Sequence, residues 1–375
     1  MIFNQFTEWA KLTQVKKFLI DHIDPLGQGV FKDGDDIFFI PKTLPTEEGE
    51  FEIIRKKKGV HFGKVSNLTK PAPNRIEPSC PHFSECNGCH FLHTDYDSEI
   101  NYKQKSYTKL IRNTFNINEN PKVLLASNRL GYRNRIQLHY DLKKLKIGFL
   151  AKNGRDIIST PRCTVMNSLV AIEFERLIVR EEWIKEARKT NKRVGHLEIY
   201  DSPNGILVSW NKPYAQGGFT QVNAQMNERM LDTFSKHHVH AENTLDLFGG
   251  KGNISNVFDY KKRICVDLYD DETNNEFFNC NLFEDSALDN FKIKNTDFSC
   301  DFMIVDPPRA GFKNLKQWVN EFSPEKILYV SCHPATMMRD LWPIAANYTI
   351  NEYLMIDLFP STFHYEGAVL LERIS

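Results

Sequence analysis

The chain has 375 residues, of which 41% are hydrophobic and 26% are charged, and its formal net charge is zero. This composition suits a globular protein of two or three domains, and the balanced charge excludes a chain that binds nucleic acid through a global excess of positive charge. No apolar run approaches the roughly 20 residues of a membrane helix, and the first residues lack the apolar stretch of a signal peptide. We therefore expect a cytoplasmic protein that does not enter a membrane.

Residues 1–70 have the pattern of a small β module. Short β-type runs lie at 29–31, 36–41, 50–54 and 61–65, and clusters of Gly, Asp and Pro separate them. Small barrels of this kind often bind single-stranded nucleic acid on an open strand face. The residues alone are also compatible with a generic small barrel that has no ligand.

Three closely spaced cysteines follow a Pro-rich linker. Cys80, Cys86 and Cys89 form the pattern C-x5-C-x2-C, which in a cytoplasmic protein is typical of metal ligation rather than of disulfides. Cys163 is the best candidate for a fourth thiolate, and four thiolates suit either zinc or an iron–sulfur cluster. Three other cysteines are interpreted as packing residues: Cys265, Cys280 and Cys300.

The middle of the chain changes from helical to strand-like patterns. Segment 95–115 has apolar residues at helical spacing, which predicts an amphipathic helix. From about residue 123 to residue 220 the pattern is β-rich, and segment 217–234 then leads into a helix. These observations predict a central domain over 71–220, and the helix at 95–115 could pack on the domain that follows.

A ligand-binding edge is predicted in the segments after residue 240. Residues 244–258 read as a strand, a Gly-rich turn and a helix, and the next strand ends at Asp267. Glycines let the backbone turn tightly and approach a ligand, and an acidic residue about 20 residues further on can accept hydrogen bonds from ribose hydroxyls. Asn281 follows the next predicted strand and could read an adenine, although a turn residue is the more ordinary role for Asn there.

Two short apolar runs, 302–305 and 327–330, predict buried strands of a parallel sheet, so residues 221–375 should form a doubly wound α/β domain. Asp306 follows the first run, and Cys332 closely follows the second. In open α/β sheets the chemistry lies beyond the carboxyl ends of the strands, so these two residues should face one crevice. The polar neighbours of Cys332 favour a nucleophile over a buried packing cysteine.

The same residues resemble a known family. DPPRAGF at 306–312 and SCHPAT at 331–336 are similar to the paired signatures of the RNA uracil-5-methyltransferases, which use S-adenosylmethionine. The family usually has Asn at the position of His333. Three further family motifs match, so that the likeness extends over nearly the whole chain: Phe-x-Gln-x-Asn at 219–223, the Gly-rich turn at 246–253 and Phe-Pro-x-Thr-x-His-x-Glu at 359–366.

The resemblance implies roles for individual residues. Cys332 would be the nucleophile and Glu366 the base. Six residues would contact S-adenosylmethionine, the last of them placed between cofactor and uracil: Gln221, Phe248, Asn253, Asp267, Asn281 and Asp306. A [4Fe–4S] cluster would be held by four thiolates: Cys80, Cys86, Cys89 and Cys163. The family has Cys at the position of Gly249 and Glu at the position of Asp267.

Residues 1–70 resemble the TRAM module, an OB-like barrel that binds RNA in several modification enzymes, with Thr46 where the module usually has Gly. The resemblance thus implies a TRAM barrel over 1–70, an iron–sulfur domain over 71–220 and a Rossmann-like methyltransferase domain over 221–375. The implied function is the formation of 5-methyluridine in 23S rRNA by a monomer. Two alternatives stay open: the T-loop uridine of tRNA as substrate, with the same chemistry, and a non-catalytic RNA-binding protein stapled by zinc.

Overall fold

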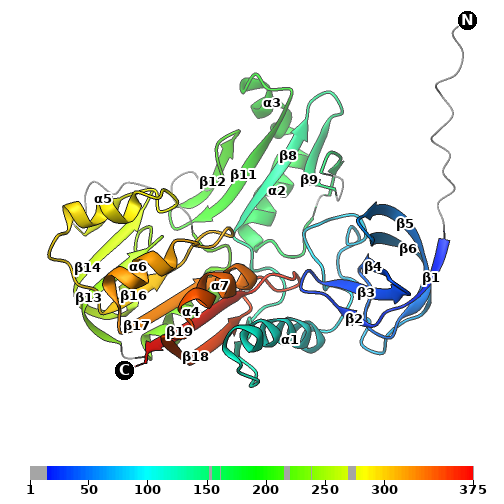
Figure 1. Ribbon diagram of the computed structural model, residues 1–375. Helices are drawn as coiled ribbons and strands as arrows, with labels where there is room; N and C mark the ends of the chain where they lie inside the picture. Colours follow the sequence, from blue (N-terminus) through cyan, green and yellow to red (C-terminus); the bar gives the residue numbers. More distant parts are fainter. Residues whose placement is uncertain are drawn as a thin grey trace, which may run out of the picture. The chain divides into compact units, whose positions relative to one another are not determined.

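The computed structural model describes residues 15–151, 154–160, 162–214, 220–237, 239–268 and 276–374. The chain divides into two compact units. The first contains Met1–Tyr102 and Ser361–Phe363, and the second contains Lys103–Pro360 and His364–Ser375. The described residues form three sheets, of six, five and eight strands (Figure 1). None of the helices in these residues is long and apolar enough to cross a membrane.

The first unit is built around a six-stranded sheet with the order β1-β5-β6-β4-β3-β2. Its strands are β1 Val15–Leu19, β2 His22–Ile23, β3 Gln28–Asp33, β4 Asp36–Pro41, β5 Glu48–Lys57 and β6 Val60–Lys70. Apolar side chains on one side of the strands pack into a small core: Phe18, Ile20, Phe38, Ile40 and Phe51. All four predicted β-type runs lie in these strands, so the prediction of a small β module is confirmed.

The turn before β5 ties this sheet to the segment that follows it. Thr46 has φ +71°, a left-handed conformation that a β-branched residue rarely adopts and that glycine adopts without strain. Next to it, Glu47 is fully buried and accepts hydrogen bonds from the backbone N–H groups of Leu44 (2.9 Å) and Ala72 (3.1 Å). Both of its carboxylate oxygens also accept from the Arg75 guanidinium. The strained turn thus places a buried carboxylate that fastens the linker after β6.

The second unit contains a five-stranded antiparallel sheet with the order β10-β9-β8-β11-β12. Its strands are β8 Arg135–Asp141, β9 Lys146–Leu150, β10 Ile157–Ile158, β11 Val194–Ser202 and β12 Gly205–Trp210. Two helices pack on one face of this sheet, α2 Ser168–Val179 and α3 Glu182–Lys189 (Figure 1).

The β-rich pattern predicted for 123–220 is present in the strands of this region, but the two helices between β10 and β11 were not predicted. The signal for α2 is present in the sequence: the Asn167 side chain caps the helix by accepting from the Val170 N–H at 2.9 Å, and Val170, Phe174 and Leu177 are buried at helical spacing. The predicted helix at 95–115 is confirmed as α1 Tyr96–Phe115.

An eight-stranded sheet forms the rest of the second unit, in the order β15-β14-β13-β16-β17-β19-β18-β7. Its strands are β7 Lys122–Leu124, β13 His240–Leu247, β14 Asp259–Asp267, β15 Phe277–Asn279, β16 Phe302–Val305, β17 Lys326–Ser331, β18 Tyr348–Ile356 and β19 Glu366–Arg373. Its helices are α4 Ala224–Ser235, α5 Ala287–Lys294, α6 Leu315–Phe322 and α7 Pro334–Leu341. The sequence-predicted runs at 302–305 and 327–330 are confirmed as β16 and β17.

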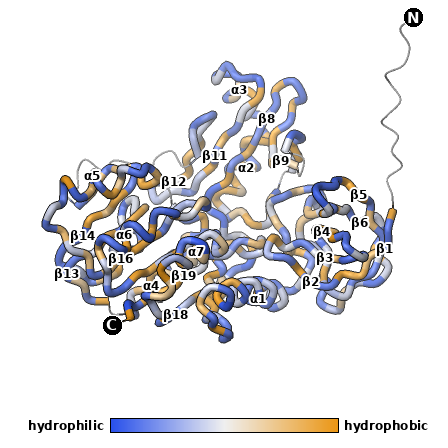
Figure 2. The backbone as a smooth tube through the Cα atoms, viewed as in Figure 1, coloured by the Kyte–Doolittle hydropathy of each residue, from blue (hydrophilic) through white to orange (hydrophobic). Residues whose placement is uncertain are grey.

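The parallel part of this sheet is doubly wound, as predicted. β13 pairs in parallel with β14 on one side and with β16 on the other, so the strand order reverses at β13. β16 is buried along its whole length and hydrophobic along the tube in Figure 2. In such sheets ligands bind beyond the carboxyl ends of the strands at the point of reversal, which here lies between β13 and β16.

The helix predicted after the Gly-rich turn is absent from the described residues, which instead contain a 3₁₀ turn, η1 Ser255–Val257. The register pairs His240 with Asp259, so residues 248–258 must return along the whole of β13. That strand is about 23 Å long at roughly 3.3 Å per residue, whereas 11 residues of α-helix cover about 16 Å. The connection is therefore too short to be helical.

Candidate active site

The register of three strands brings the predicted catalytic residues together. Cys332 directly follows β17, and Glu366 is the first residue of the antiparallel strand β19. Ser331 pairs with Gly367, so one step further along the ladder Cys332 lies opposite Glu366. Asp306 directly follows β16, the parallel neighbour of β17. Sheet pairing thus gathers two carboxyl groups and a thiol at one edge.

The Cys332 thiol lies among charges of both signs. Burial, together with the carboxyl groups of Glu366 and Asp306, raises the pKa of Cys332 to about 12. Arg309 acts in the opposite direction, through its charge and through a hydrogen bond to the thiol. Arg309 therefore lies close to the thiol. In this arrangement the thiol holds its proton at neutral pH.

Glu366 has a free buried oxygen. The residue is 4% exposed, and its Oε2 atom has no hydrogen-bond partner among the described residues. Burial and the Asp306 charge raise the pKa of Glu366 well above its usual value, and Arg309 opposes them. An orphaned buried carboxylate oxygen in a native fold calls for a ligand, and a carboxyl group with a raised pKa is suited to proton transfer near neutral pH.

The turn that carries Cys332 is fixed by the residue that departs from the family pattern. His333 is the N-cap of α7, and its Nδ1 atom accepts from the Thr336 N–H at 3.3 Å. The His333 N–H in turn donates to Ser331 Oγ at 3.0 Å, and Pro334 occupies the first turn of the helix. An Asn side chain would cap in the same way, so the histidine preserves the hydrogen bonds of the turn.

Helix α7 also holds the loop that carries Asp306 and Arg309. Asp340 on α7 is buried and accepts from the Phe312 N–H at 2.5 Å and from the Tyr329 hydroxyl at 2.8 Å. Its neighbour Arg339 donates to the Ala310 carbonyl at 2.8 Å and to the Asp340 carboxylate. The sequence analysis did not identify Asp340. The only feature that could have pointed to it is a charged residue on the buried face of a helix.

Three carboxyl groups lie at the carboxyl ends of the central strands. The Gly250 N–H donates to Asp267 Oδ2 at 3.0 Å, so the Gly-rich turn and the end of β14 are joined. Burial is the main cause that raises the pKa of Asp246 to about 6 and that of Asp306 to about 7. The charge of Asp267 contributes to both shifts, and that of Asp246 contributes to the shift of Asp306. A cationic ligand at this edge would relieve that repulsion, and a sulfonium cofactor supplies such a charge.

The Gly-rich turn explains the departure at Gly249. A Cβ atom there would lie 2.4 Å from the carboxyl carbon of Asp246, so the glycine leaves room for this side chain. Asp246 accepts a short hydrogen bond from the Ser255 hydroxyl, which also accepts from Arg263. Gly250 has φ +51°, a conformation that favours glycine. The turn is therefore shaped by a buried polar network beneath it.

Two other predicted cofactor residues flank this edge. Phe248 follows β13 with φ +62°, and its ring packs against Phe283 (5.5 Å between centroids) and Phe312 (5.1 Å). Asn281 caps its own turn by accepting from the Phe283 N–H at 3.2 Å, the ordinary role considered from the sequence. Its side-chain amide donates to Glu284 at 3.1 Å. Phe283 therefore connects the two residues, through its ring to Phe248 and through its backbone N–H to Asn281.

The remaining two predicted cofactor residues, Asn253 and Gln221, lie near the start of α4 or contact it. Asn253 is exposed and exchanges two side-chain hydrogen bonds with Asn227, at 3.0 and 3.2 Å. Gln221 precedes the helix, and its carbonyl accepts from the Asn134 side chain at 3.2 Å. Phe219, the first residue of the matched motif, lies outside the described residues. The roles of these residues toward a cofactor stay predictions.

The predicted cluster ligands lie in both units. Cys80, Cys86 and Cys89 are half-buried in the first unit, and Cys163 is half-buried in the second. The Gly88 N–H donates to Cys86 Sγ at 3.3 Å, a bond that a ligating thiolate can accept, and soft thiolates are suitable donors for iron–sulfur clusters. Within the described residues, no three Cys, His, Asp or Glu side chains are grouped to hold a metal ion. The cluster stays a prediction.

The fold and the site define an α/β protein whose parallel strands end at a Gly-rich turn of the kind that binds nucleotides. A thiol and a carboxyl group lie close together beside it. Residues 274–374 match the sequence profile of the tRNA (uracil-5-)-methyltransferase family. The chain is 28% identical to the 23S rRNA (uracil(1939)-C(5))-methyltransferase RlmD of Shewanella sediminis, an alignment that covers 94% of this chain and 95% of that protein. It is likewise 28% identical to the protein of that name from Francisella tularensis subsp. novicida, over 93% and 94% of the two chains.

The fold is also similar to a solved structure. The tRNA (uracil-54, C5)-methyltransferase of Pyrococcus abyssi, determined in complex with S-adenosyl-L-homocysteine, has a TM-score of 0.70, with 21% identity over 95% of this chain and 99% of that one. The sequence-based resemblance to the RNA uracil-5-methyltransferases is thus confirmed: the family profile matches residues 274–374, and the relative from Shewanella sediminis aligns over 94% of this chain.

Proposed function

We propose that this protein methylates carbon 5 of a uridine in 23S rRNA and uses S-adenosylmethionine as the methyl donor. The observation that carries the proposal is the ladder that sets Cys332 opposite Glu366 at the edge where Asp306 ends β16. A thiol and a buried carboxyl group side by side are the two groups that this reaction requires of the protein. The similarity to proteins named 23S rRNA methyltransferases extends over more than nine-tenths of the chain and supports rRNA as the substrate.

In the proposed reaction, Cys332 adds as the thiolate to carbon 6 of uracil, and the electron pair of the C5=C6 bond moves onto carbon 5 as an enolate. Carbon 5 then takes the methyl group as the S–CH₃ bond of the sulfonium breaks. Glu366 removes the proton from carbon 5, the C5=C6 bond re-forms and Cys332 leaves as the thiolate. Atoms and charge balance, with S-adenosylhomocysteine and 5-methyluridine as products.

Side chains of the protein control the reactivity of Cys332 and the position of the uracil base in these steps. Arg309 favours the Cys332 thiolate, and the carboxyl groups of Glu366 and Asp306 oppose it, so a cationic ligand beside these carboxyl groups would favour the reactive thiolate. Asp306 is placed to hydrogen-bond the uracil edge. A target base in folded RNA must leave its stack to reach such a crevice.

Bound S-adenosylmethionine would supply an electrophilic methyl group on a cationic sulfur. Asp267 would accept from its ribose, next to the Gly-rich turn that its carboxylate already holds. The other proposed contacts are Gln221, Phe248, Asn253, Asn281 and Asp306. The positive φ at Gly250 and the excess of carboxyl groups at the strand ends support a cationic nucleoside ligand here.

We also propose a structural [4Fe–4S] cluster on Cys80, Cys86, Cys89 and Cys163. The C-x5-C-x2-C spacing and the N–H···S bond at Cys86 support it. Residues 1–70 would act as a TRAM module that binds RNA, and the protein would work as a cytoplasmic monomer.

The test of the proposed function is to map 5-methyluridine in rRNA and tRNA from cells with and without the gene. Loss of one modified uridine from 23S rRNA is expected. Loss from the tRNA T-loop instead would favour the second candidate, which the names of the matched family and of the Pyrococcus enzyme support. Unchanged RNA in both pools, together with stoichiometric zinc in the protein, would favour a non-catalytic RNA-binding protein.

A further inference from the structure

One end of the five-stranded sheet carries a concentrated positive charge. The residues involved lie in two segments, 141–146 and 185–193, which contain eight lysines and arginines and two acidic residues, whereas the whole chain has no net charge. All eight basic side chains are exposed. We call this surface the basic end: Lys143, Lys144, Lys146, Lys185, Arg188, Lys189, Lys192 and Arg193.

The two basic segments are separate in the sequence, and the fold brings them together into a single surface. Asp141 at the end of β8 pairs with Lys146 on β9 and with Val194 on β11. The Leu142 N–H donates to the Arg193 carbonyl at 2.9 Å, so the β8–β9 hairpin and the turn between α3 and β11 touch. Two stretches that are about 40 residues apart in the chain therefore place their basic side chains together at one end of the sheet.

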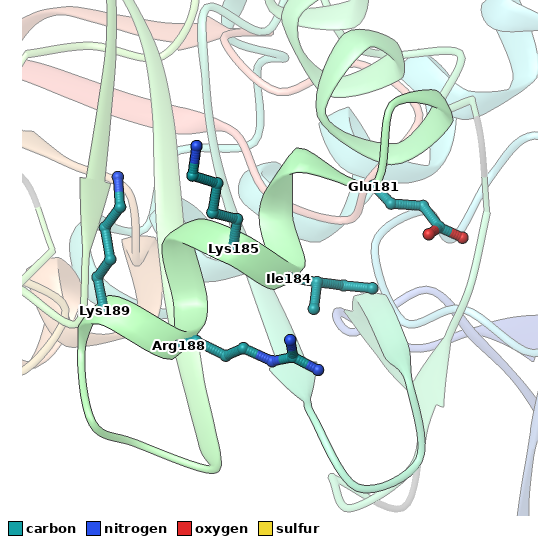
Figure 3. A pocket seen from close by; sticks show the side chains of 5 residues that line it. All are labelled: Glu181, Ile184, Lys185, Arg188 and Lys189. Atoms are coloured by element: carbon teal, nitrogen blue, oxygen red, sulfur yellow. The ribbon is translucent and has the colours of Figure 1, made fainter.

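Helix α3 presents its basic side chains around a hollow. Trp183 and Ala187 are the buried residues of α3, one turn apart. Lys185, Arg188 and Lys189 line an open hollow together with Ile184 and Glu181. In Figure 3, Lys185 and Lys189 point to one side of α3 and Arg188 points to the other. Basic side chains around an open concave surface can contact an extended anion from more than one direction, as a polynucleotide backbone requires.

Only part of this charge is offset within the described residues, where the hydrogen bond from the Lys144 N–H and then the charges of Lys144 and Arg193 lower the pKa of Asp141. Glu186 pairs with Lys189 at 2.7 Å, and Lys144 approaches Asp156 at 4.0 Å, in both cases on the surface where such pairs are weak. In the described part of the chain, Lys185, Arg188 and Lys192 form no ion pair. Mutual repulsion among exposed cations destabilises a fold slightly, so a cluster of this density is a sign of a polyanionic partner.

We infer that the basic end is a docking surface for the phosphate backbone of the RNA substrate, remote from the uridine that reacts. The opposite end of β8 begins at Arg135, next to Asn134, whose N–H donates to the Val222 carbonyl ahead of α4. β8 spans about 20 Å at roughly 3.3 Å per residue, so the basic end contacts nucleotides well outside the reacting crevice. This inference rests on the proposed function for the identity of the polyanion, which is RNA.

The test compares two triple variants that remove the same charge. Lys185→Gln, Arg188→Gln and Lys189→Gln change the basic end. Three paired lysines of the eight-stranded sheet and its helices serve as the control: Lys236→Gln, Lys261→Gln and Lys292→Gln. Binding of each full-length protein to a 23S rRNA fragment that contains the target uridine is measured at several salt concentrations.

The basic-end variant should bind about 10- to 100-fold more weakly near 0.15 M salt, and the slope of log affinity against log salt should fall by about 2 to 3, since each phosphate contact contributes roughly 0.7–0.9. The control should change little in both quantities. Equal losses in the two variants would mean that only net charge matters, and unchanged binding would mean a solvated surface. Either result would overturn the inference.

A second measurement separates this inference from the proposed function. With a short oligoribonucleotide that contains only the target uridine and its neighbours, the basic-end variant should keep the wild-type kcat and KM, whereas KM for the long fragment should rise. If the wild-type protein methylates neither RNA, the proposed function fails, and the salt dependence still decides whether the basic end binds RNA. If the variant loses kcat on the short substrate, the basic end is not a remote docking surface.

Discussion

The catalytic edge and the cysteine-rich loop differ in what assembles them. Cys332 and Glu366 are far apart in the sequence, yet one antiparallel ladder sets them opposite each other. Cys80, Cys86 and Cys89 lie close together in the sequence, yet the described residues contain no group of three metal ligands. Backbone pairing builds the first site without a ligand. A metal site of thiolates depends on the metal itself, because bare thiols have no reason to converge.

The largest effects are expected at the catalytic pair. Cys332→Ala should reduce methylation below about one-thousandth of wild type, because the covalent bond to carbon 6 cannot form, and it should leave RNA and cofactor binding intact. Glu366→Gln should instead accumulate a methylated protein–RNA adduct, since attack and methyl transfer precede proton removal. Denaturing electrophoresis with labelled RNA detects the adduct.

The control for the adduct is the double variant, Cys332→Ala with Glu366→Gln, which should give no slow-migrating band. Normal turnover by Glu366→Gln would assign the base to another group. Synthesis of 5-methyluridine by Cys332→Ala would contradict the covalent mechanism.

A smaller effect on catalysis is expected from the cysteine-rich loop. Cys86→Ser should lower the iron content from about four atoms per chain toward zero and lower the melting temperature, because the loop loses the ligand that gathers it. The anaerobically purified variant should keep much of its methyltransferase activity, because no cluster cysteine lies at the catalytic edge. Iron analysis and the absorption spectrum are the measurements.

Cys280→Ser is the matched control, since Cys280 is also half-buried and is read as a packing residue. It should retain wild-type iron. Stoichiometric zinc and no iron in the anaerobically purified wild-type protein would show that these cysteines bind zinc and not an iron–sulfur cluster.

A moderate effect is expected from the residue that couples the two catalytic loops. Asp340→Asn weakens the acceptor for the Phe312 N–H and the Tyr329 hydroxyl, at a cost of about 1–3 kcal/mol in the free energy of unfolding. The loosened loop should hold Arg309 less well against the thiol, so the pKa of Cys332 should rise above its already raised value of about 12. Only the thiolate reacts, so alkylation of Cys332 speeds up as pH rises, and at a fixed pH of 8 the variant should react roughly 3- to 10-fold more slowly.

Asp232→Asn, which removes a carboxylate from an exposed ion pair on α4, is the control and should leave the alkylation profile unchanged. An Asp340→Asn protein that is less stable but has a wild-type pH profile would show that Asp340 supports the fold alone. A shifted profile identifies it as a positioning residue.

The smallest effect is expected at Thr46 and has the opposite sign. Thr46→Gly should stabilise the protein by about 0.5–1 kcal/mol, because relief of the left-handed strain exceeds the entropy that glycine adds to the unfolded chain. Chemical unfolding measures the change. Thr349→Gly, at an exposed paired position of strand β18, should instead destabilise by a similar amount. A loss of stability at both sites would show that Thr46 is not strained.

The sequence predicted the strands and site residues that depend on a local pattern. It did not predict features that depend on how distant segments are connected. The apolar runs at 302–305 and 327–330 locate β16 and β17, and their polar ends locate Asp306 and Cys332. The prediction of a helix after the Gly-rich turn was wrong, because no local pattern shows that residues 248–258 must span the whole of β13. Asp340 was missed because its partners lie on another strand and another loop, which only the folded chain brings to it.

One feature of the first unit bears on how the chain is made. Ser361 belongs to that unit: its N–H donates to the buried Glu99 at 2.7 Å, and its carbonyl accepts from the N–H groups of His90 and Phe91. The ribosome synthesises Glu99 262 residues before Ser361, a delay of roughly 10–50 s at about 5–20 residues per second. The first unit must therefore wait, incomplete, until residues 361–363 emerge from the ribosome, and chaperones that shield the nascent chain have that interval in which to act.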